Sequence, residues 1–291
     1  MRLEHYQDIQ GFSAHVATFL LEHEAEHNLL LGILDTLRHN PQHYSEQPAY
    51  LACVHDDQDQ LVAVALRTPP HGLVLSQCRH LEALPLIIHD IRDMVLPSVL
   101  APKILARPFA QLWQQHSGAA HSLMLAERIY KLEQVRPVRG IDGHLRRASQ
   151  EDRAVLIEFM EAFQREALAH TPHLSAADSV DKRLSRQQLF VWEQEGRIVS
   201  LAGIAGYTPN GARIGPVYTP TTERGHGYAS AAVAALSQRL LESGKRFCFL
   251  FTDLANPTSN HIYQNIGYQP VIDVDMYRFI PAAQTSAAPA A

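Results

Sequence analysis

Some stretches of this sequence carry residues whose types and spacing could do chemistry. The first is EHEAEH, which contains the pattern H-E-x-x-H. On a helix, this spacing offers two histidines to a zinc ion and a glutamate to a water molecule. We expect residues 12–37 to form such a helix, with His23 and His27 about 40° apart on its apolar face.

The remaining parts of a zinc site are missing from this pattern. No G-x-x-H follows His27, and Glu46, beyond the Asn40-Pro41 break, is only a speculative third ligand. Little chain precedes the helix to form a substrate-binding sheet edge. A chain with 17 histidines also produces the pattern by chance. A zinc hydrolase therefore stays a minor alternative, and we predict no metal.

The second stretch is TPTTERGHGYAS, which precedes a long helical segment. Gly225 and Gly227 remove side chains where backbone amides would approach a ligand, and Ala229 keeps the helix start compact. Amides at the start of a helix, at the positive end of its dipole, bind phosphate oxygens. Arg224 and His226 would add donors. The alternative is an ordinary strand-to-helix turn, because glycines also serve tight turns.

The third stretch, NPTSNHIYQNIGY, follows a buried strand. Asn256 comes directly after that strand, Tyr263 lies seven residues later on a short helix, and Gly267-Tyr268 ends the helix. The order is a strand ending in V-Y-T, then R-G-x-G-x-A, a long helix, a strand, and N-x6-Y-x3-G-Y. Over about residues 144–280, this order resembles the GNAT N-acetyltransferase superfamily.

The resemblance implies a domain that binds acetyl-CoA as co-substrate. Two parallel strands of its central sheet, here 213–219 and 246–252, would splay apart and receive the pantetheine arm between them. Backbone groups of Val217, Tyr218 and Thr219 would pair with that arm and direct donors at the thioester carbonyl. Such preorganised donors stabilise the oxyanion of a tetrahedral intermediate.

Two further details belong to the same site. Proline cannot donate to a sheet ladder, so Gly215-Pro216 indicates an edge or a bulge. The family usually has Gln or Arg where this chain has Thr222, which puts one phosphate contact in doubt. The resemblance places the pyrophosphate on the amides of a continuous segment, namely Arg224, Gly225, His226, Gly227, Tyr228, Ala229 and Ser230.

The resemblance also assigns roles in catalysis. Tyr263 would protonate the departing thiolate: a phenol of pKa about 10 can give a proton to a thiolate whose conjugate acid is near 8.5 if it is held within hydrogen-bond reach. Its alternative role is packing of the short helix. Asn256 would hydrogen-bond the CoA arm, cap the helix, or do both. The base that deprotonates the amine is not assigned; its candidates are Glu158, Glu161, Glu166, His170 and His173.

The elements that position these residues form two similar halves. Each half has a helical opening segment, a strand–turn–strand pair before a Thr-Pro break, and a closing strand with a tyrosine, which indicates an internal duplication. The first half lacks the glycine pair, since CRHLEALPLIIHDIRDM follows LVLSQ. In the second half, Ser149 is the expected N-cap of one helix, Gly244 ends another, and a hairpin closes the domain.

We therefore predict an α+β (α/β) protein with two GNAT-like domains. Each would contain a mixed, mostly antiparallel sheet flanked by helices, with splayed parallel strands in the C-terminal domain. Pro and Gly gather at 134–144 between the halves. The expected ranges are 1–136 for an N-terminal domain without the CoA motif, 140–281 for the acetyltransferase domain, and 282–291 for a disordered tail.

Composition limits the classes of partner. The net charge is −5, charged residues make up 19%, and no basic run or patch indicates a nucleic acid. The three cysteines lie far apart, which favours a reducing compartment. No apolar run reaches 18 residues, so we expect a cytoplasmic protein without membrane contact. Its acceptor would be an amine-bearing small molecule or peptide; a non-catalytic acetyl-CoA sensor is the alternative.

Overall fold

The computed structural model describes residues 1–167 and 174–281, which divide into two compact units. Of the described residues, unit 1 comprises 1–129, 253–255 and 271–281, and unit 2 comprises 130–167, 174–252 and 256–270. Two base candidates, His170 and His173, lie outside the described residues, as does the expected tail at 282–291.

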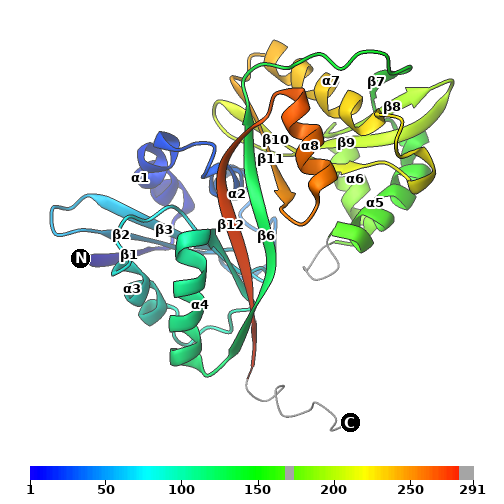
Figure 1. Ribbon diagram of the computed structural model, residues 1–291. Helices are drawn as coiled ribbons and strands as arrows, with labels where there is room; N and C mark the ends of the chain where they lie inside the picture. The colour runs from blue at the N-terminus through cyan, green and yellow to red at the C-terminus, as the bar shows by residue number, and fades with distance from the viewer. Residues whose placement is uncertain (168–173, 282–291) are drawn as a thin grey trace, which may run out of the picture. The chain divides into compact units, whose positions relative to one another are not determined.

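Unit 1 is a mixed sheet with helices on both faces (Figure 1). Its strands lie in the order β1-β2-β3-β4-β5-β12, where residues 274–278 of β12 run antiparallel to β5. The elements are β1 (Arg2–Tyr6), α1 (Ile9–Glu22), α2 (Asn28–His39), β2 (Tyr50–His55), β3 (Leu61–Arg67), β4 (Leu73–Leu75), α3 (Ala83–Asp90), β5 (Ser98–Pro102), α4 (Lys103–Ser117), β6 (Ala120–Leu132) and β12 (Gln269–Ile280).

Unit 2 contains the sheet order β7-β8-β9-β10-β11. All its neighbouring strands are antiparallel except β10 and β11, which are parallel. Its elements are β7 (His144–Arg147), the 3₁₀ turn η1 (Gln150–Asp152), α5 (Arg153–Ala167), α6 (Ala176–Ser185), β8 (Leu189–Gln194), β9 (Arg197–Tyr207), β10 (Gly211–Tyr218), η2 (Thr221–Glu223), α7 (Tyr228–Glu242), β11 (Phe247–Asp253) and α8 (Pro257–Ile266).

The two halves of the chain, which are not the same as the two units, share one order of elements. Strand, two helices, three strands, helix, strand, helix and strand follow each other both from β1 to β6 and from β7 to β12. In each unit the fourth and fifth strands, β4 with β5 and β10 with β11, are the parallel pair. The predicted mixed α/β architecture is confirmed.

The division of the chain differs from the expected boundaries of 1–136 and 140–281. The closing segment is one continuous strand, β12, rather than the expected hairpin. Residues 271–281 belong to unit 1, because β12 pairs with β5 there and contributes Tyr277 and Phe279 to the core of that unit.

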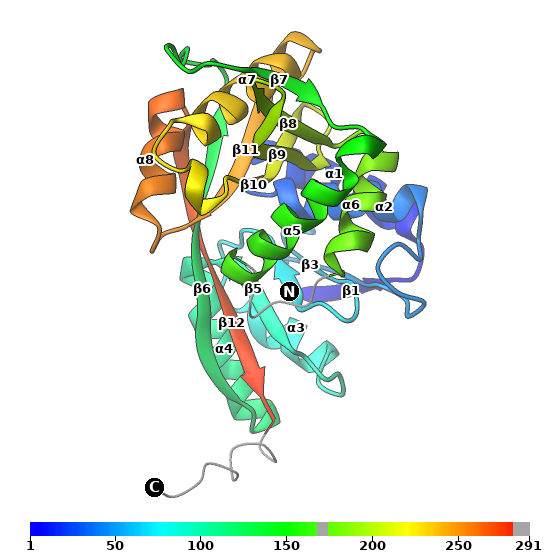
Figure 2. The same ribbon diagram turned by 90° about the vertical axis from the view of Figure 1, so that its right-hand side faces the viewer.

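Side-chain alternation along the strands explains the layers of unit 2 (Figures 1 and 2). On β8, Phe190 and Trp192 pack in the cluster that contains α7, whereas Leu189 and Val191 pack in the cluster that contains α5 and α6. Successive residues of a strand point to opposite faces, so an apolar run on β8 fills both layers. β2 in unit 1 divides in the same way between α3–α4 and α1–α2.

Several helix ends follow the sequence expectations. The Asp152 carboxylate accepts a hydrogen bond from the Ser149 amide at 2.7 Å, within the capping box that begins the helical segment of η1 and α5. Helix α7 ends before Gly244, whose φ is +99°. A left-handed residue at this position favours glycine. Both predicted helix boundaries are therefore confirmed.

The expected helix at 12–37 is wrong, because residues 23–27 form a turn between α1 and α2. The cause is His27, which is 2% exposed. Its Nδ1 lies 3.1 Å from the Leu20 carbonyl, and its Nε2 accepts from the Gln77 amide at 3.1 Å. Both ring nitrogens of His27 are thus used by the backbone. His23 is 41% exposed and faces Glu26, so the two histidines do not form a zinc-binding pair.

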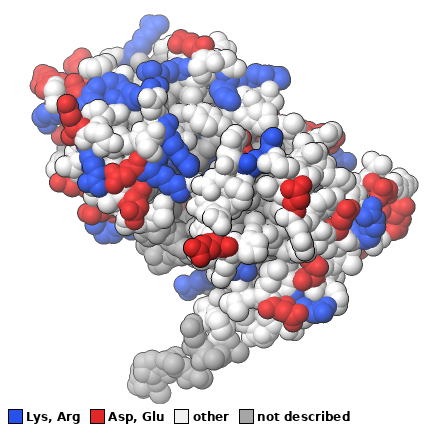
Figure 3. All heavy atoms as spheres, turned by 180° about the vertical axis from the view of Figure 1, so that it is seen from behind, with Lys and Arg blue, Asp and Glu red and all other residues white. Residues whose placement is uncertain are grey.

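The surface carries both signs of charge. Figure 3 shows basic and acidic side chains interspersed over the visible face. In unit 2, Arg146 donates to both oxygens of Asp152 at 2.7 and 2.9 Å and to Glu193 at 2.5 Å. Arg146 lowers the pKa of Asp152.

Within residues 1–167 and 174–281, no helix combines the length and the apolar character needed to cross a membrane.

Candidate functional site

The parallel strands β10 and β11 of unit 2 are paired only over their first residues. Their parallel pairing joins Gly211 to Phe247 and ends with Arg213 opposite Phe249. β10 nevertheless continues to Tyr218, and β11 continues to Asp253. The last five residues of β10 therefore have no parallel pairing with β11. This agrees with the separation of strands 213–219 and 246–252 that the family resemblance implied.

The irregularity in β10 lies at Gly215 and Pro216. The register of β10 against β9 shifts between Arg213 and Ile214 and again between Ile214 and Val217. Proline has no amide hydrogen to donate to a ladder, and bulges accommodate it. Of the two expected alternatives at Gly215-Pro216, an edge or a bulge, the register shifts show a bulge, which follows directly after the last residue of β10 paired with β11.

The end of β10 is held from β9 and from the following turn. Ser200 donates its hydroxyl to the Tyr218 carbonyl at 3.1 Å and bonds the Thr219 hydroxyl at 2.9 Å. The Thr219 carbonyl accepts from Arg224 Nε at 3.0 Å. Two carbonyls of the segment Val217–Thr219 thus already have partners within the protein.

The glycine turn leads from this strand end into α7. Gly225 and Gly227 have φ values of +85° and +82°, a region that side-chain-bearing residues avoid. An ideal Cβ on Gly227 would lie 2.7 Å from Ile141 Cδ1, whereas one on Gly225 meets nothing within 4 Å. The Gly227 N-cap has no side chain to accept from the first turn of α7. The amides from Gly225 to Ser230 have no acceptor among the described residues, and free amides of this kind bind anions.

Arg224 and His226 point their side chains at protein groups. Arg224 Nη2 donates to Glu166 Oε2 at 2.7 Å, and its guanidinium lies 5.7 Å from the centre of the Tyr218 ring. His226 Nδ1 lies 3.3 Å from the Glu223 carbonyl, and its ring stacks on that of Tyr228. The side chains of Arg224 and His226 thus contact the residues around the glycine turn.

Helix α8 carries the two remaining predicted residues. Asn256 is its N-cap, and its Oδ1 accepts from the Ser259 amide at 3.0 Å, so the capping role is confirmed. Tyr263 is half-buried, and its ring packs edge-on against Tyr268 at 6.0 Å. Its hydroxyl makes no hydrogen bond to another described residue. Burial raises the pKa of Tyr263 to about 12, so it carries a proton at neutral pH.

The apolar core connects these parts. Tyr263 of α8 and Val217 of β10 both pack against the cluster that contains Tyr228 and the buried face of α7. Tyr268, at the end of α8, is hydrogen-bonded at 2.8 Å to Ser237 on α7. The strand end, the glycine turn and α8 are thus positioned by one core.

Three of the base candidates lie on α5. Glu158 and Glu161 are exposed. Glu166 is different, because it bonds Arg224 and also accepts from the Tyr218 hydroxyl at 3.4 Å. Glu166 therefore joins α5 to the end of β10. Sequence reasoning missed this contact, because Glu166 and Arg224 lie 58 residues apart. It also missed that of Ser200, which depends on the register of β9 against β10.

The comparisons with known proteins agree with this geometry. The matching family model is described as "Acetyltransferase (GNAT) family" and covers residues 154–268. This segment, which runs from α5 to the end of α8, is a GNAT acetyltransferase domain. The resemblance inferred from the motifs is thereby confirmed. No curated protein sequence matches the chain.

Solved structures resemble the chain beyond the GNAT domain. A GNAT-family acetyltransferase from Colwellia psychrerythraea is 14% identical, with a TM-score of 0.59 over 96% of this chain and 100% of its own. A Drosophila protein is 10% identical, with a TM-score of 0.70 over 96% and 98%. A GCN5-related N-acetyltransferase from Sphaerobacter thermophilus is 14% identical, with a TM-score of 0.58 over 84% of this chain and 84% of its own. At these identities the likeness is one of fold.

Proposed function

We propose that this chain is an N-acetyltransferase that moves an acetyl group from acetyl-CoA to a primary amine in a ternary complex. The observation that carries the proposal is the unpaired start of α7 behind Gly225 and Gly227, next to the parted ends of β10 and β11. The amides from Gly225 to Ser230 would bind the pyrophosphate, and the end of β10 would pair with the pantetheine arm. The Arg224 amide, which was also expected to contact the pyrophosphate, donates to the Thr221 carbonyl at 3.4 Å instead.

The reaction would proceed by direct attack. The neutral amine attacks the thioester carbonyl carbon, and the amides of Tyr218 and Thr219 stabilise the oxyanion that forms. Collapse breaks the C–S bond, and the Tyr263 hydroxyl gives its proton to the departing thiolate. The amine nitrogen loses one proton to a base, for which Glu166 is the candidate with described contacts at the strand end. The Asn256 amide nitrogen is available to hydrogen-bond the CoA arm.

We further propose that unit 1 is a copy of the GNAT domain that lacks the phosphate site. The shared order of elements and the matching parallel strand pairs support this. The connection from β4 to α3, residues 76–82, contains no glycine. The cysteines of both units, Cys53, Cys78 and Cys248, are free thiols. This supports our proposal of a reducing, cytoplasmic location.

Calorimetric titration with acetyl-CoA tests the site. Gly225→Glu should weaken binding by about 100-fold, because the carboxylate opposes the phosphates and the strained φ distorts the turn. The matched control is Gly244→Glu: Gly244 also has a positive φ, +99°, with nothing within 4 Å of an ideal Cβ. It should bind like wild type. Absence of wild-type binding, or equal weakening in both variants, would contradict the proposed site.

Turnover needs a separate measurement. A panel of small and peptidyl amines, followed by release of the CoA thiol, should reveal at least one acceptor. Binding of acetyl-CoA without turnover of any amine would instead support a non-catalytic sensor. The two experiments thus separate failure of the binding site from failure of the proposed reaction.

A further inference from the structure

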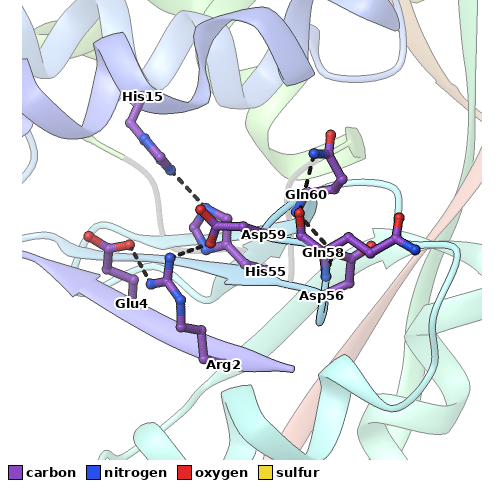
Figure 4. A network of polar contacts seen from close by, with 8 residues as sticks. All are labelled: Arg2, Glu4, His15, His55, Asp56, Gln58, Asp59 and Gln60. Carbon is purple, nitrogen blue, oxygen red and sulfur yellow. Dashed lines mark hydrogen bonds and ion pairs between the residues drawn. The ribbon is translucent and has the colours of Figure 1, made fainter.

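Four side chains with metal-binding groups gather in unit 1. Glu4, His15, Cys53 and His55 each offer one ligand atom, and these four atoms all lie within 4.8 Å of one another. Figure 4 shows three of them, with His15 reaching down from α1 to His55 and Glu4 on the neighbouring strand. None of the four belongs to the H-E-x-x-H segment.

Strand pairing explains why these residues meet. Glu4 of β1 lies directly opposite Cys53 of β2, and opposite residues of an antiparallel pair point to the same face. His55 follows Cys53 by two residues and so shares that face. Helix α1 covers this face of the sheet and supplies His15. The arrangement therefore depends on a strand register and on helix packing.

The two imidazoles face each other at close range. Their Nε2 atoms lie 3.0 Å apart. His55 is 2% exposed, and its Nδ1 is buried without a hydrogen-bond partner. This second nitrogen of His55 is therefore a further potential ligand atom, besides the Nε2 that faces His15. His15 is exposed, so the cluster is open to solvent on one side.

The donor types select the kind of cation. Two imidazoles, one thiol and one carboxylate suit borderline metals such as zinc, whereas calcium and magnesium require oxygen ligands. Bond lengths of about 2.0–2.3 Å in tetrahedral zinc sites place ligand atoms roughly 3.3–3.8 Å apart. The two Nε2 atoms, 3.0 Å apart, are already near that separation, and the other ligand atoms, which lie within 4.8 Å of one another, need to approach by up to about 1.5 Å.

Neighbouring groups bear on the charge of the cluster. Arg2 donates to Glu4 at 3.1 Å and to Asp59 at 2.5 Å, so Asp59 can hold its guanidinium when Glu4 turns to a cation. Burial raises the pKa of the Cys53 thiol to about 12, so a metal must displace its proton.

We propose that Glu4, His15, Cys53 and His55 form a binding site for a single zinc-class divalent cation. The bound ion joins α1 to the edge of the sheet of unit 1 at β1 and β2. The cation loses bound water on entry, and the Cys53 thiol releases its proton to solvent. The site is independent of the proposed acetyl transfer, whose residues all lie in unit 2.

The first test is metal content. Full-length protein without a histidine tag, purified without chelator, should contain about one zinc per chain. His15→Ala should lose most of it, and because His15 is exposed, this variant should still fold. The matched control is His39→Ala, which removes another exposed helical histidine and should keep the metal. Equal zinc content in wild type and His15→Ala would overturn the proposal.

The second test identifies the thiolate and the charge balance. Cobalt loaded into the wild type should give a thiolate-to-metal charge-transfer band, which Cys53→Ser should lose and Cys78→Ser should keep. Arg2→Gln should bind zinc several-fold more tightly, because it removes a positive charge and frees Glu4. Looser binding by Arg2→Gln, or a charge-transfer band in folded Cys53→Ser, would contradict the site. Acetyl-CoA titrations of all variants should match wild type.

Discussion

Tyr263 is the single residue on which the proposed chemistry depends most directly. Its pKa of about 12 means that the hydroxyl stays protonated across the range in which an amine acceptor would be assayed. Tyr263→Phe should lower kcat by about 10²–10⁴-fold, the usual contribution of a general acid, with little change in the binding of acetyl-CoA. Because Tyr263 does not ionise below about pH 10, the ratio of the wild-type kcat to the Tyr263→Phe kcat should stay constant between pH 6 and pH 10.

A second tyrosine provides the control for that measurement. Tyr268→Phe removes a buried hydroxyl from the same cluster and leaves Ser237 without its 2.8 Å hydrogen bond. It should reduce stability by about 1 kcal/mol and leave kcat near the wild-type value. If Tyr263→Phe and Tyr268→Phe have equal kcat values, Tyr263 has only a packing role.

At the scale of elements, the break between α1 and α2 depends on one neutral histidine. Burial is the main cause that lowers the pKa of His27, to about 4, against about 6.5 in an unfolded chain. The unfolded state therefore binds more protons between these values. The stability that His27 contributes is fully present above about pH 6.5 and is lost as the pH falls toward 4. The free energy of unfolding that is lost in this way amounts to about 3 kcal/mol.

Substitution with a side chain that does not titrate tests this dependence. Glutamine can donate to the Leu20 carbonyl and accept from the Gln77 amide, but it takes up no proton. Urea unfolding at several pH values should show a shallower fall in stability between pH 6.5 and 4 for His27→Gln than for wild type. His39→Gln, at an exposed position, should keep the wild-type slope. Equal slopes in all three proteins would show that His27 takes up its proton normally when folded.

The same region shows why some elements can be predicted from sequence and others cannot. Local signals suffice for α7, where a glycine pair precedes a small-residue helix and Gly244 follows it, and for the bulge at Gly215-Pro216. The 12–37 segment has helical periodicity throughout, yet the contact of His27 with Gln77 joins residues 50 positions apart. No local pattern contains such a contact, so tertiary structure overrides the periodicity.

The same distinction applies to the chemical groups. The glycine turn, Asn256 and Tyr263 lie at fixed spacings along one strand–helix–strand unit, so a motif could identify them. Glu166 with Arg224, and Glu4 with Cys53, are brought together by packing or strand register. The sequence therefore indicated H-E-x-x-H as the possible metal site, whereas the groups that lie close enough together to hold a metal are those of β1, α1 and β2.

At the scale of the whole molecule, the two units are not two consecutive pieces of chain. Residues 271–280 of β12 complete the sheet of unit 1, although β12 follows directly after the GNAT domain. Phe279 is 7% exposed and packs 6.0 Å from Trp113 of α4, between ring centres. A fragment that ends at residue 136 would therefore lack part of the core of its own unit.

A substitution in β12 should consequently destabilise a unit that is remote from it in sequence. Phe279→Ala should cost about 3–5 kcal/mol, because it leaves a cavity in the core of unit 1. Hydrogen exchange should accelerate in β4 and β5, while β8 and β9 of unit 2 stay protected. Arg278→Ala, at an exposed position of the same strand, should leave both patterns unchanged. If Phe279→Ala accelerates exchange in β8 and β9 as much as in β5, the chain unfolds as a single cooperative body, and the assignment of β12 to one unit has no energetic meaning.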